Sequence, residues 1–157
     1  MGETRIGVHS GPVIIGNMGG DVIFNYAAHG DAINTAARME GVNKYLGTRI
    51  AVSIETASRC PDFSGRPVGS VVLKGKTSGI LAFQPLSPEK METPMIKAYL
   101  AACDLLTGEE SGLIPDGQAR AAFEELIKQY PEDPLIRFHH GRLQQGEKGT
   151  LIYMFDK

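Results

Sequence analysis

Residues 26–53 read YAAHGDAINTAARMEGVNKYLGTRIAVS, and they contain the clearest structural signals in the chain. Residues 30–40 have helical character, and Asp31 is suited to the N-cap because its carboxylate can accept hydrogen bonds from the first turn. Gly47 is a suitable end for this helix. Arg49–Val52 then has the composition of a short strand. The stretch therefore predicts a helix followed by a strand, in a chain of mixed α and β structure.

Strand signals lie on both sides of this helix. Residues 5–9 alternate in polarity and end at a Ser-Gly-Pro turn. The apolar run at 13–15 is followed by glycines, which predicts a hairpin whose return strand is 22–26. Further on, 68–73 and 79–86 read as an antiparallel pair joined by a short turn.

The composition changes at residues 85–88, where two prolines mark a boundary. Apolar residues beyond it recur at helical spacing over 95–106 and again over 119–130. A proline-rich link follows, in which Asp133 is the expected N-cap and Pro134 the first residue of a helix. The pattern resembles a single tetratricopeptide-type helical hairpin, which cannot bury its apolar face alone. We therefore expect it to pack on the rest of the chain or on a partner.

The overall composition excludes several classes of protein. The chain has 157 residues, with 16 Lys and Arg against 18 Asp and Glu, a net charge of −2. This balance argues against a nucleic-acid-binding protein, which needs a basic face. No apolar run approaches the roughly 18–20 residues of a membrane span. The two cysteines form no CxxC motif, so free thiols in a reducing cytoplasm are expected.

The first candidate site is the pair Asn34 and Arg38. The two residues are four positions apart, so on a helix they project from one face. An amide and a planar guanidinium suit a sugar oxygen and a phosphate. The alternative is a solvated helix face that carries no function.

The second candidate is Lys74-Gly75-Lys76, which follows an apolar strand. A lysine at a strand end can act as a point charge on a polyphosphate. Residues 70–77 nearly match a Walker A motif, but Ser70 replaces its first glycine and an apolar strand fills its interior. A strand cannot wrap a phosphate with successive amides, so we reject that motif. The alternative is a basic hairpin turn without a ligand.

Two adjacent histidines, His139 and His140, are weak candidates. On a helix they point about 100° apart, which makes them poor metal co-ligands. We predict that they lie on the surface.

Taken in order, three runs of sequence resemble the carboxyl half of a class III nucleotidyl (adenylate or guanylate) cyclase catalytic domain. They are RIGVHSGPVIIGNMGG (5–20), the stretch 26–53 and VLKGKTSGILAFQPL (72–86). The resemblance implies an α+β fold derived from the ferredoxin-like arrangement and lacking its amino-terminal half. It assigns residues 1–86 to the cyclase domain and 87–157 to a helical extension. The end of the chain also resembles the tail of bacterial sensor-type adenylate cyclases, whose parent proteins are membrane-anchored.

The resemblance also implies a set of functional residues. By position, Asn34 would orient the ribose, Arg38 would stabilise the α-phosphate in the transition state, and Lys74 would hold the terminal phosphates. Tyr26 and Ala27 occupy positions on the base side of the substrate, which would be ATP or GTP. The family forms its active site at a homodimer interface, and the expected product is cyclic AMP.

The sequence departs from the family in two respects. The family binds Mg²⁺ or Mn²⁺ through two aspartates on strands that precede the RIGVHSG strand, so we expect these ligands upstream of this chain. Ala27 stands where the family often has Asp or Thr, and its methyl group cannot hydrogen-bond to a base. These departures leave open a non-catalytic regulatory or dimerisation module. Without a neighbour, the strand at 4–9 should drive association, unless the run at 150–155 covers its edge.

Overall fold

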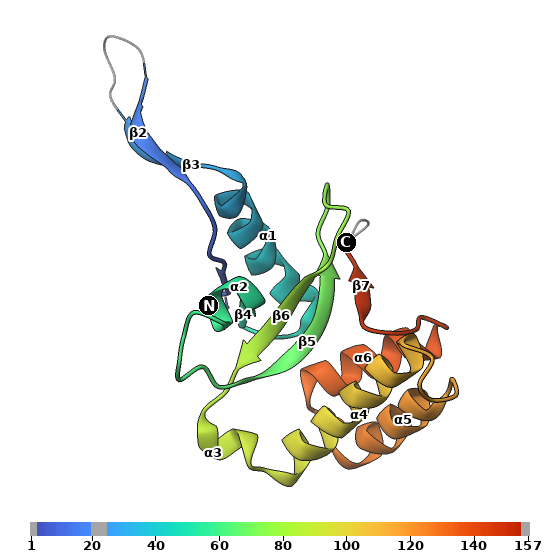
Figure 1. The fold of residues 1–157 in the computed structure, drawn as a ribbon. Helices are drawn as coiled ribbons and strands as arrows, with labels where there is room; N and C mark the ends of the chain where they lie inside the picture. The colour runs from blue at the N-terminus through green and yellow to red at the C-terminus, as the bar shows by residue number, and fades with distance from the viewer. Residues whose placement is uncertain (1–2, 20–24, 155–157) are drawn as a thin grey trace.

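The computed structural model describes residues 3–19 and 25–154 and has a five-stranded mixed sheet at its centre (Figure 1). Along the sheet the strands are β1 (Ile6–Val8), β4 (Ile50–Ser53), β6 (Ile80–Pro85), β5 (Gly65–Val72) and β7 (Leu151–Tyr153). The β1–β4 and β5–β7 pairs are parallel, and β6 is antiparallel to both of its neighbours. This arrangement confirms the predicted α+β class and the predicted pairing of β5 with β6.

Helix α1 (Asp31–Leu46) packs directly on β1 and ends where the sequence predicts. Gly47 takes a left-handed conformation at its carboxyl end, with φ of 70°. A Cβ atom on Gly7 of β1 would lie only 2.2 Å from the backbone nitrogen of Glu40, so this contact requires glycine. The buried Asn43 side chain also donates to the Ile6 carbonyl at 3.0 Å. Together these contacts fix α1 against the sheet.

The predicted N-cap of α1 is wrong. Gly30 is the capping residue, and Asp31 is the first residue of the helix, with no side-chain hydrogen bond to the first turn. The Asp31 carboxylate instead forms an ion pair with the Lys76 ammonium group, 45 residues further along the chain. A long-range charge partner has therefore replaced the local cap.

A two-stranded hairpin projects away from the sheet (Figure 1). Its strands are β2 (Ile14–Met18) and β3 (Asn25–His29), paired antiparallel with Ile14 opposite His29. The predicted return strand 22–26 falls partly outside the described residues, and β3 continues three residues beyond it. Ile14, Ile15 and Tyr26 expose 72%, 58% and 77% of their surface. The arm therefore presents apolar side chains to its surroundings.

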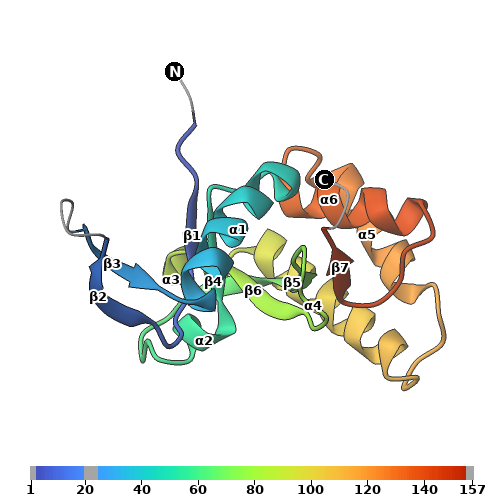
Figure 2. The same ribbon diagram turned by 90° about the horizontal axis from the view of Figure 1, so that it is seen from above.

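The other elements of the described chain are helices. They are α2 (Ile54–Ala57), α3 (Pro88–Met91), α4 (Pro94–Glu110), α5 (Gln118–Gln129) and α6 (Pro134–Gln144). Asp133 caps α6 through the Ile136 amide at 2.9 Å, as predicted. Figure 2 shows α4, α5 and α6 gathered beside β5 and β7, while α1 lies next to β1 and β4. In the described ranges, none of these helices combines the length and apolarity needed to cross a bilayer.

Buried polar contacts join the helices to β5. The Arg66 guanidinium on β5 binds both carboxylate oxygens of Asp133 at 2.8 and 3.1 Å. The Tyr99 hydroxyl of α4 donates to the Pro67 carbonyl at 2.7 Å. His139 lies 2.9 Å from the Val68 carbonyl and is 1% exposed, so its predicted surface position is wrong. Sheet and helices thus share one continuous core.

The two edges of the sheet differ. Strand β7 pairs with β5, with Ser70 opposite Leu151 and Val72 opposite Tyr153. The described part of the 150–155 run therefore does not cover β1, which lies at the opposite end of the sheet. Within the described ranges, β1 has a strand neighbour on one side only. The expected association through this edge stays a prediction.

Candidate functional site

The middle of α1 and the turn after β5 meet at Arg38 and Lys74. The Arg38 guanidinium donates a hydrogen bond to the Lys74 carbonyl, across 36 residues of sequence. The turn is closed by the Lys76 amide, which donates to the Leu73 carbonyl at 2.9 Å. Gly75 has a φ of 79°, a left-handed conformation that glycine adopts without strain. The fold therefore brings two residues of the predicted site into direct contact.

A second contact ties this turn to the start of α1. The Lys76 ammonium group hydrogen-bonds to the Asp31 carboxylate. This hydrogen bond, with the positive charges of Lys76, Arg38 and His9, lowers the pKa of Asp31 below its ordinary value. The helix and the turn are thus joined at two points, one at each lysine flanking Gly75.

Arg38 and Lys74 line a groove of about 270 Å³ together with a third cation, Lys44. The other residues of this groove are Gly41, Val42, Tyr45, Leu73 and Met154. Val42, Leu73 and Met154 are almost fully buried, so they form an apolar floor. Among the residues that the structure describes, no acidic side chain lines the groove. Three cations without a described carboxylate beside them favour an anion.

The remaining predicted residues lie outside this groove. Asn34 is exposed on α1, one turn before Arg38, so the two side chains project from the same side of the helix. Tyr26 and Ala27 belong to strand β3 of the projecting hairpin, where Tyr26 pairs with Asn17 and Ala27 with Gly16. The structure therefore groups Arg38 with Lys74 and places Tyr26 and Ala27 on a separate element.

The described residues do not fit a divalent-cation site. Among them, no three His, Cys, Asp or Glu side chains lie close enough together to hold a metal ion. Asp31, which contacts the basic turn, is already paired with Lys76. The carboxylates that Mg²⁺ or Mn²⁺ prefers are therefore not assembled in this part of the chain.

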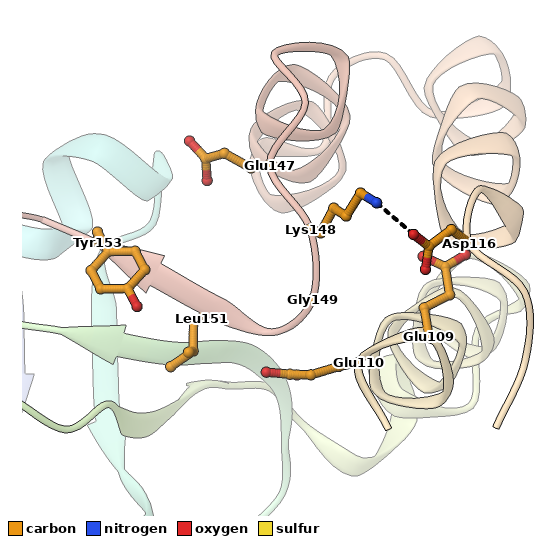
Figure 3. Close-up of a pocket in the computed structure, with 8 residues that line it drawn as sticks. All are labelled: Glu109, Glu110, Asp116, Glu147, Lys148, Gly149, Leu151 and Tyr153. Atoms are coloured by element: carbon orange, nitrogen blue, oxygen red, sulfur yellow. Dashed lines mark hydrogen bonds and ion pairs between the residues drawn. The ribbon is translucent and has the colours of Figure 1, made fainter. Parts of the chain in front are cut away.

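The largest of the described cavities, about 540 Å³, has the opposite charge (Figure 3). It lies between the end of α4 and β7, and its acidic residues are Glu109, Glu110, Asp116 and Glu147. Two of these carboxylates are structural: Glu109 accepts from the Ala119 amide at 2.8 Å, and Glu110 from the Thr150 amide at 3.0 Å. Asp116 pairs with Lys148, as Figure 3 shows. The acidic surroundings make this cavity unsuitable for a polyphosphate.

Sequence reasoning missed several residues of the basic groove. Lys44 follows Arg38 on α1 by less than two helical turns, and no motif marks it. Met154 follows β7, whose pairing with β5 has no local signal. The Asp31–Lys76 ion pair was also missed, although both residues belong to the motifs that were identified. The opposite charges of Asp31 and Lys76, in two separate motifs, could have indicated this pair.

Comparison with known proteins identifies the class to which this fold and site belong. Residues 2–98 match the family described as "Adenylate and Guanylate cyclase catalytic domain". The chain therefore belongs to the class III adenylate and guanylate cyclase family. The match ends inside α4, so α5, α6 and β7 lie outside it. No solved structure gave a significant match.

Individual relatives include both kinds of cyclase. Adenylate cyclase 1 of Rhizobium meliloti is 36% identical over 79 residues, which is 50% of this chain and 12% of that protein. Terminal-differentiation-specific adenylate cyclase of Dictyostelium discoideum is 27% identical over 156 residues, 97% of this chain but 7% of its own length. Human retinal guanylyl cyclase 2 is 43% identical over 78 residues, covering 47% of this chain and 7% of that protein. The chain thus spans a small part of each relative.

Proposed function

We propose that this chain is the nucleotide-binding part of an adenylate cyclase, which converts ATP to cyclic AMP and pyrophosphate. In this proposal Asn34 positions the ribose, Arg38 acts on the α-phosphate and Lys74 binds the terminal phosphates. The observation that carries it is the contact between Arg38 and the Lys74 carbonyl, at a groove that no described acidic side chain lines. A solvated helix face and an unrelated basic turn would have no reason to meet in this way.

The chemistry requires positive charge at two places. The ribose 3′-oxygen attacks the α-phosphorus in line, and the bond to the bridging oxygen of pyrophosphate breaks. Negative charge grows on the α-phosphoryl oxygens and on the leaving group. A guanidinium held in place, such as Arg38, stabilises the first charge, and an ammonium group such as Lys74 stabilises the second. Catalysis of this kind depends on positioning and electrostatics, without a covalent enzyme intermediate.

The proposed active site is shared between two copies of the cyclase domain. One copy supplies Asn34, Arg38 and Lys74, and the other supplies carboxylates for Mg²⁺ or Mn²⁺. The exposed apolar hairpin supports this arrangement, because Ile14, Ile15 and Tyr26 gain by being covered. A homodimer in the cytoplasm, with ATP or GTP as the nucleotide, follows from the same proposal.

The proposal also states which purine base the site accepts. Ala27 cannot donate to or accept from a purine edge, so adenine would be chosen by other contacts. The adenylate cyclases among the relatives support ATP as the substrate. Because a guanylyl cyclase is also a relative, the test below includes GTP.

A second candidate function is a non-catalytic regulatory or dimerisation module. Two observations favour it: the methyl side chain of Ala27, and the lack of a metal-binding cluster among the described residues. Such a module would keep the fold and the exposed hairpin without turning over a nucleotide.

A hybrid protein separates the two candidates. The amino-terminal part of the cyclase domain of the Rhizobium meliloti relative is fused ahead of residue 4, and cyclic nucleotide formation is measured with ATP and with GTP. We expect cyclic AMP from the hybrid, while the 157-residue chain alone has no measurable activity. Arg38→Ala should lower kcat by about 10²–10³-fold with a small effect on KM, because the lost contact is made in the transition state.

Two controls make this result interpretable. Lys97→Ala removes an exposed charge on α4, far from the groove in sequence, and should leave kcat unchanged. Circular dichroism and a cooperative thermal transition establish that each hybrid is folded. A folded hybrid that binds ATP without forming either cyclic nucleotide would contradict the enzyme and favour the regulatory module. Robust activity of the 157-residue chain would contradict the expectation that the added amino-terminal part must supply the metal-binding carboxylates.

A further inference from the structure

Lys44 is a basic residue of α1 that has no role in the proposed function. It lines the groove of Arg38 and Lys74, and it also lines a neighbouring groove of about 370 Å³. That second groove contains Arg137 of α6 and, among the described residues, neither groove has an acidic one. Lys44 therefore lies between two grooves lined by cations.

Its charge is not neutralised within the described part of the chain. The lysines that form ion pairs there are Lys76, Lys97, Lys128 and Lys148, whereas Lys44 and Lys74 take part in none. Three cations thus line one groove of about 270 Å³, and within the described residues none of them forms an ion pair. Like charges held together raise the electrostatic energy of the folded chain, and a bound polyanion relieves this repulsion.

The floor of the groove includes a residue from outside the matched cyclase domain. Met154 follows β7, is 6% exposed and donates its amide hydrogen to the Val72 carbonyl at 3.1 Å. Val72 is two residues before Lys74, so this bond fixes the backbone that leads into the turn. The buried thioether beside Leu73 also keeps water away from one side of the groove, which strengthens the attraction between its cations and an anion.

We propose that Lys44 is a third cationic contact for the polyphosphate end of the nucleotide, and that Met154 is a positioning residue for the Lys74 turn. The inference rests on the proposed function and extends its phosphate site along α1. It gives the carboxyl-terminal extension a part in substrate binding. The ligand class is a linear polyphosphate, either the end of a nucleoside triphosphate or the pyrophosphate product.

Binding of inorganic triphosphate to the 157-residue chain tests this inference without requiring catalysis. Isothermal titration calorimetry at about 0.15 M ionic strength, where more distant charges are screened, is run on the unaltered chain and on Lys44→Gln, Lys74→Gln and Arg137→Gln. We expect Lys44→Gln to weaken binding on the order of five-fold, as for a solvated ion pair. Lys74→Gln should weaken it about ten-fold, as for a charge-assisted hydrogen bond.

Arg137→Gln is the matched control, because it removes the same charge from a residue that lines only the neighbouring groove. It should change the dissociation constant less than about two-fold. An equal loss in Lys44→Gln and Arg137→Gln would mean that net charge alone matters, and would overturn the proposed contact. No effect of Lys44→Gln beside a clear effect of Lys74→Gln would also overturn it, while leaving the cyclase proposal intact.

The role of Met154 has its own comparison. Met154→Leu keeps the apolar volume and should bind triphosphate as the unaltered chain does, whereas Met154→Ala should bind more weakly. Tyr153→Ala changes the neighbouring, more exposed residue and should bind normally. Equal binding by folded Met154→Ala would overturn this role. No binding of triphosphate by the unaltered chain at millimolar concentration would overturn both parts of the inference, whereas cyclic AMP formation by the hybrid tests the proposed function separately.

Discussion

Removing the charge of Asp133 should separate the helical extension energetically from the sheet. The Asp133 carboxylate is 8% exposed, and it accepts two hydrogen bonds from the Arg66 guanidinium, which is 2% exposed. It also caps α6 through the Ile136 amide at 2.9 Å. Asp133→Asn keeps an acceptor for the cap and removes the negative charge. Asp133→Ala removes both.

The size of the effect follows from the burial of the pair. Breaking a buried ion pair by removing one partner costs about 3–5 kcal/mol, because the other charge stays buried without compensation. Arg66 keeps its hydrogen bond to Gln84 at 2.8 Å and its position over the Tyr99 ring at 4.8 Å. We therefore expect the lower end, about 3 kcal/mol, for Asp133→Asn. Loss of the cap in Asp133→Ala should add about 1 kcal/mol.

Urea unfolding followed by circular dichroism measures these free energies. A double-mutant cycle with Arg66→Met isolates the interaction between the two side chains. The variant with both changes should be less destabilised than the sum of the single variants, by at least about 2 kcal/mol. A coupling energy near zero would refute the idea that this pair joins the two parts of the chain. So would two separate unfolding transitions in the unaltered chain, since a shared core predicts one.

Three other predictions concern packing, pH and association. Gly7→Ala places a methyl group 2.2 Å from the backbone of α1 and should cost more than about 3 kcal/mol in unfolding free energy, whereas Gly41→Ala, with open space at its Cβ position, should be neutral or stabilising. Desolvation, assisted by the charge of Arg142, lowers the pKa of His139 to about 3. The unfolded chain therefore binds this proton at a higher pH than the folded chain does, so stability should fall as the pH drops from about 6.5 towards 3, by about 2 kcal/mol at pH 4.5. A His139→Gln variant with the same pH dependence of unfolding would contradict this assignment. Light scattering coupled to size exclusion should show association of the unaltered chain, and Ile14→Lys with Ile15→Lys should reduce it. A monomer at all micromolar concentrations would contradict association through exposed apolar surface.

Elements with local signals were predictable from the sequence. Gly47 ends α1 in the left-handed conformation, and Asp133 with Pro134 starts α6, because caps depend on residues within a few positions. The β5–β6 pair was predictable for the same reason, since its strands are joined by a short turn. Asp31 shows the limit of this reasoning. The local sequence predicted that Asp31 would cap the helix, but its carboxylate forms an ion pair with Lys76, 45 residues away.

The burial of His139 could have been found from periodicity. Leu135, Ile136, His139 and Leu143 recur at the spacing of one helix face, and all four are buried. The adjacent His140 obscured this pattern, because a His-His pair suggests a polar surface. Strand β7 had no comparable signal. A parallel partner needs no turn, and three residues are too few for their alternation to indicate a strand.

For the candidate site, the residues could be predicted from the sequence, but their contact in space could not. Arg38 and Lys74 were singled out from separate motifs, and only tertiary structure shows that a hydrogen bond joins them.

The same fold makes the position of the Lys74 turn depend on the strand near the end of the chain, β7. Ser70 and Val72 of β5 bond to Thr150 and Met154 at 2.9 and 3.1 Å. A Cβ atom on Gly69 would lie 2.8 Å from the Thr150 carbonyl oxygen, so the bulged strand must have glycine there for β7 to dock. Because β5 runs directly into Lys74, displacing β7 should alter the position of this proposed phosphate contact without changing the cyclase motifs. The extension is therefore placed where it can influence the proposed nucleotide site, although it lies outside the matched family domain.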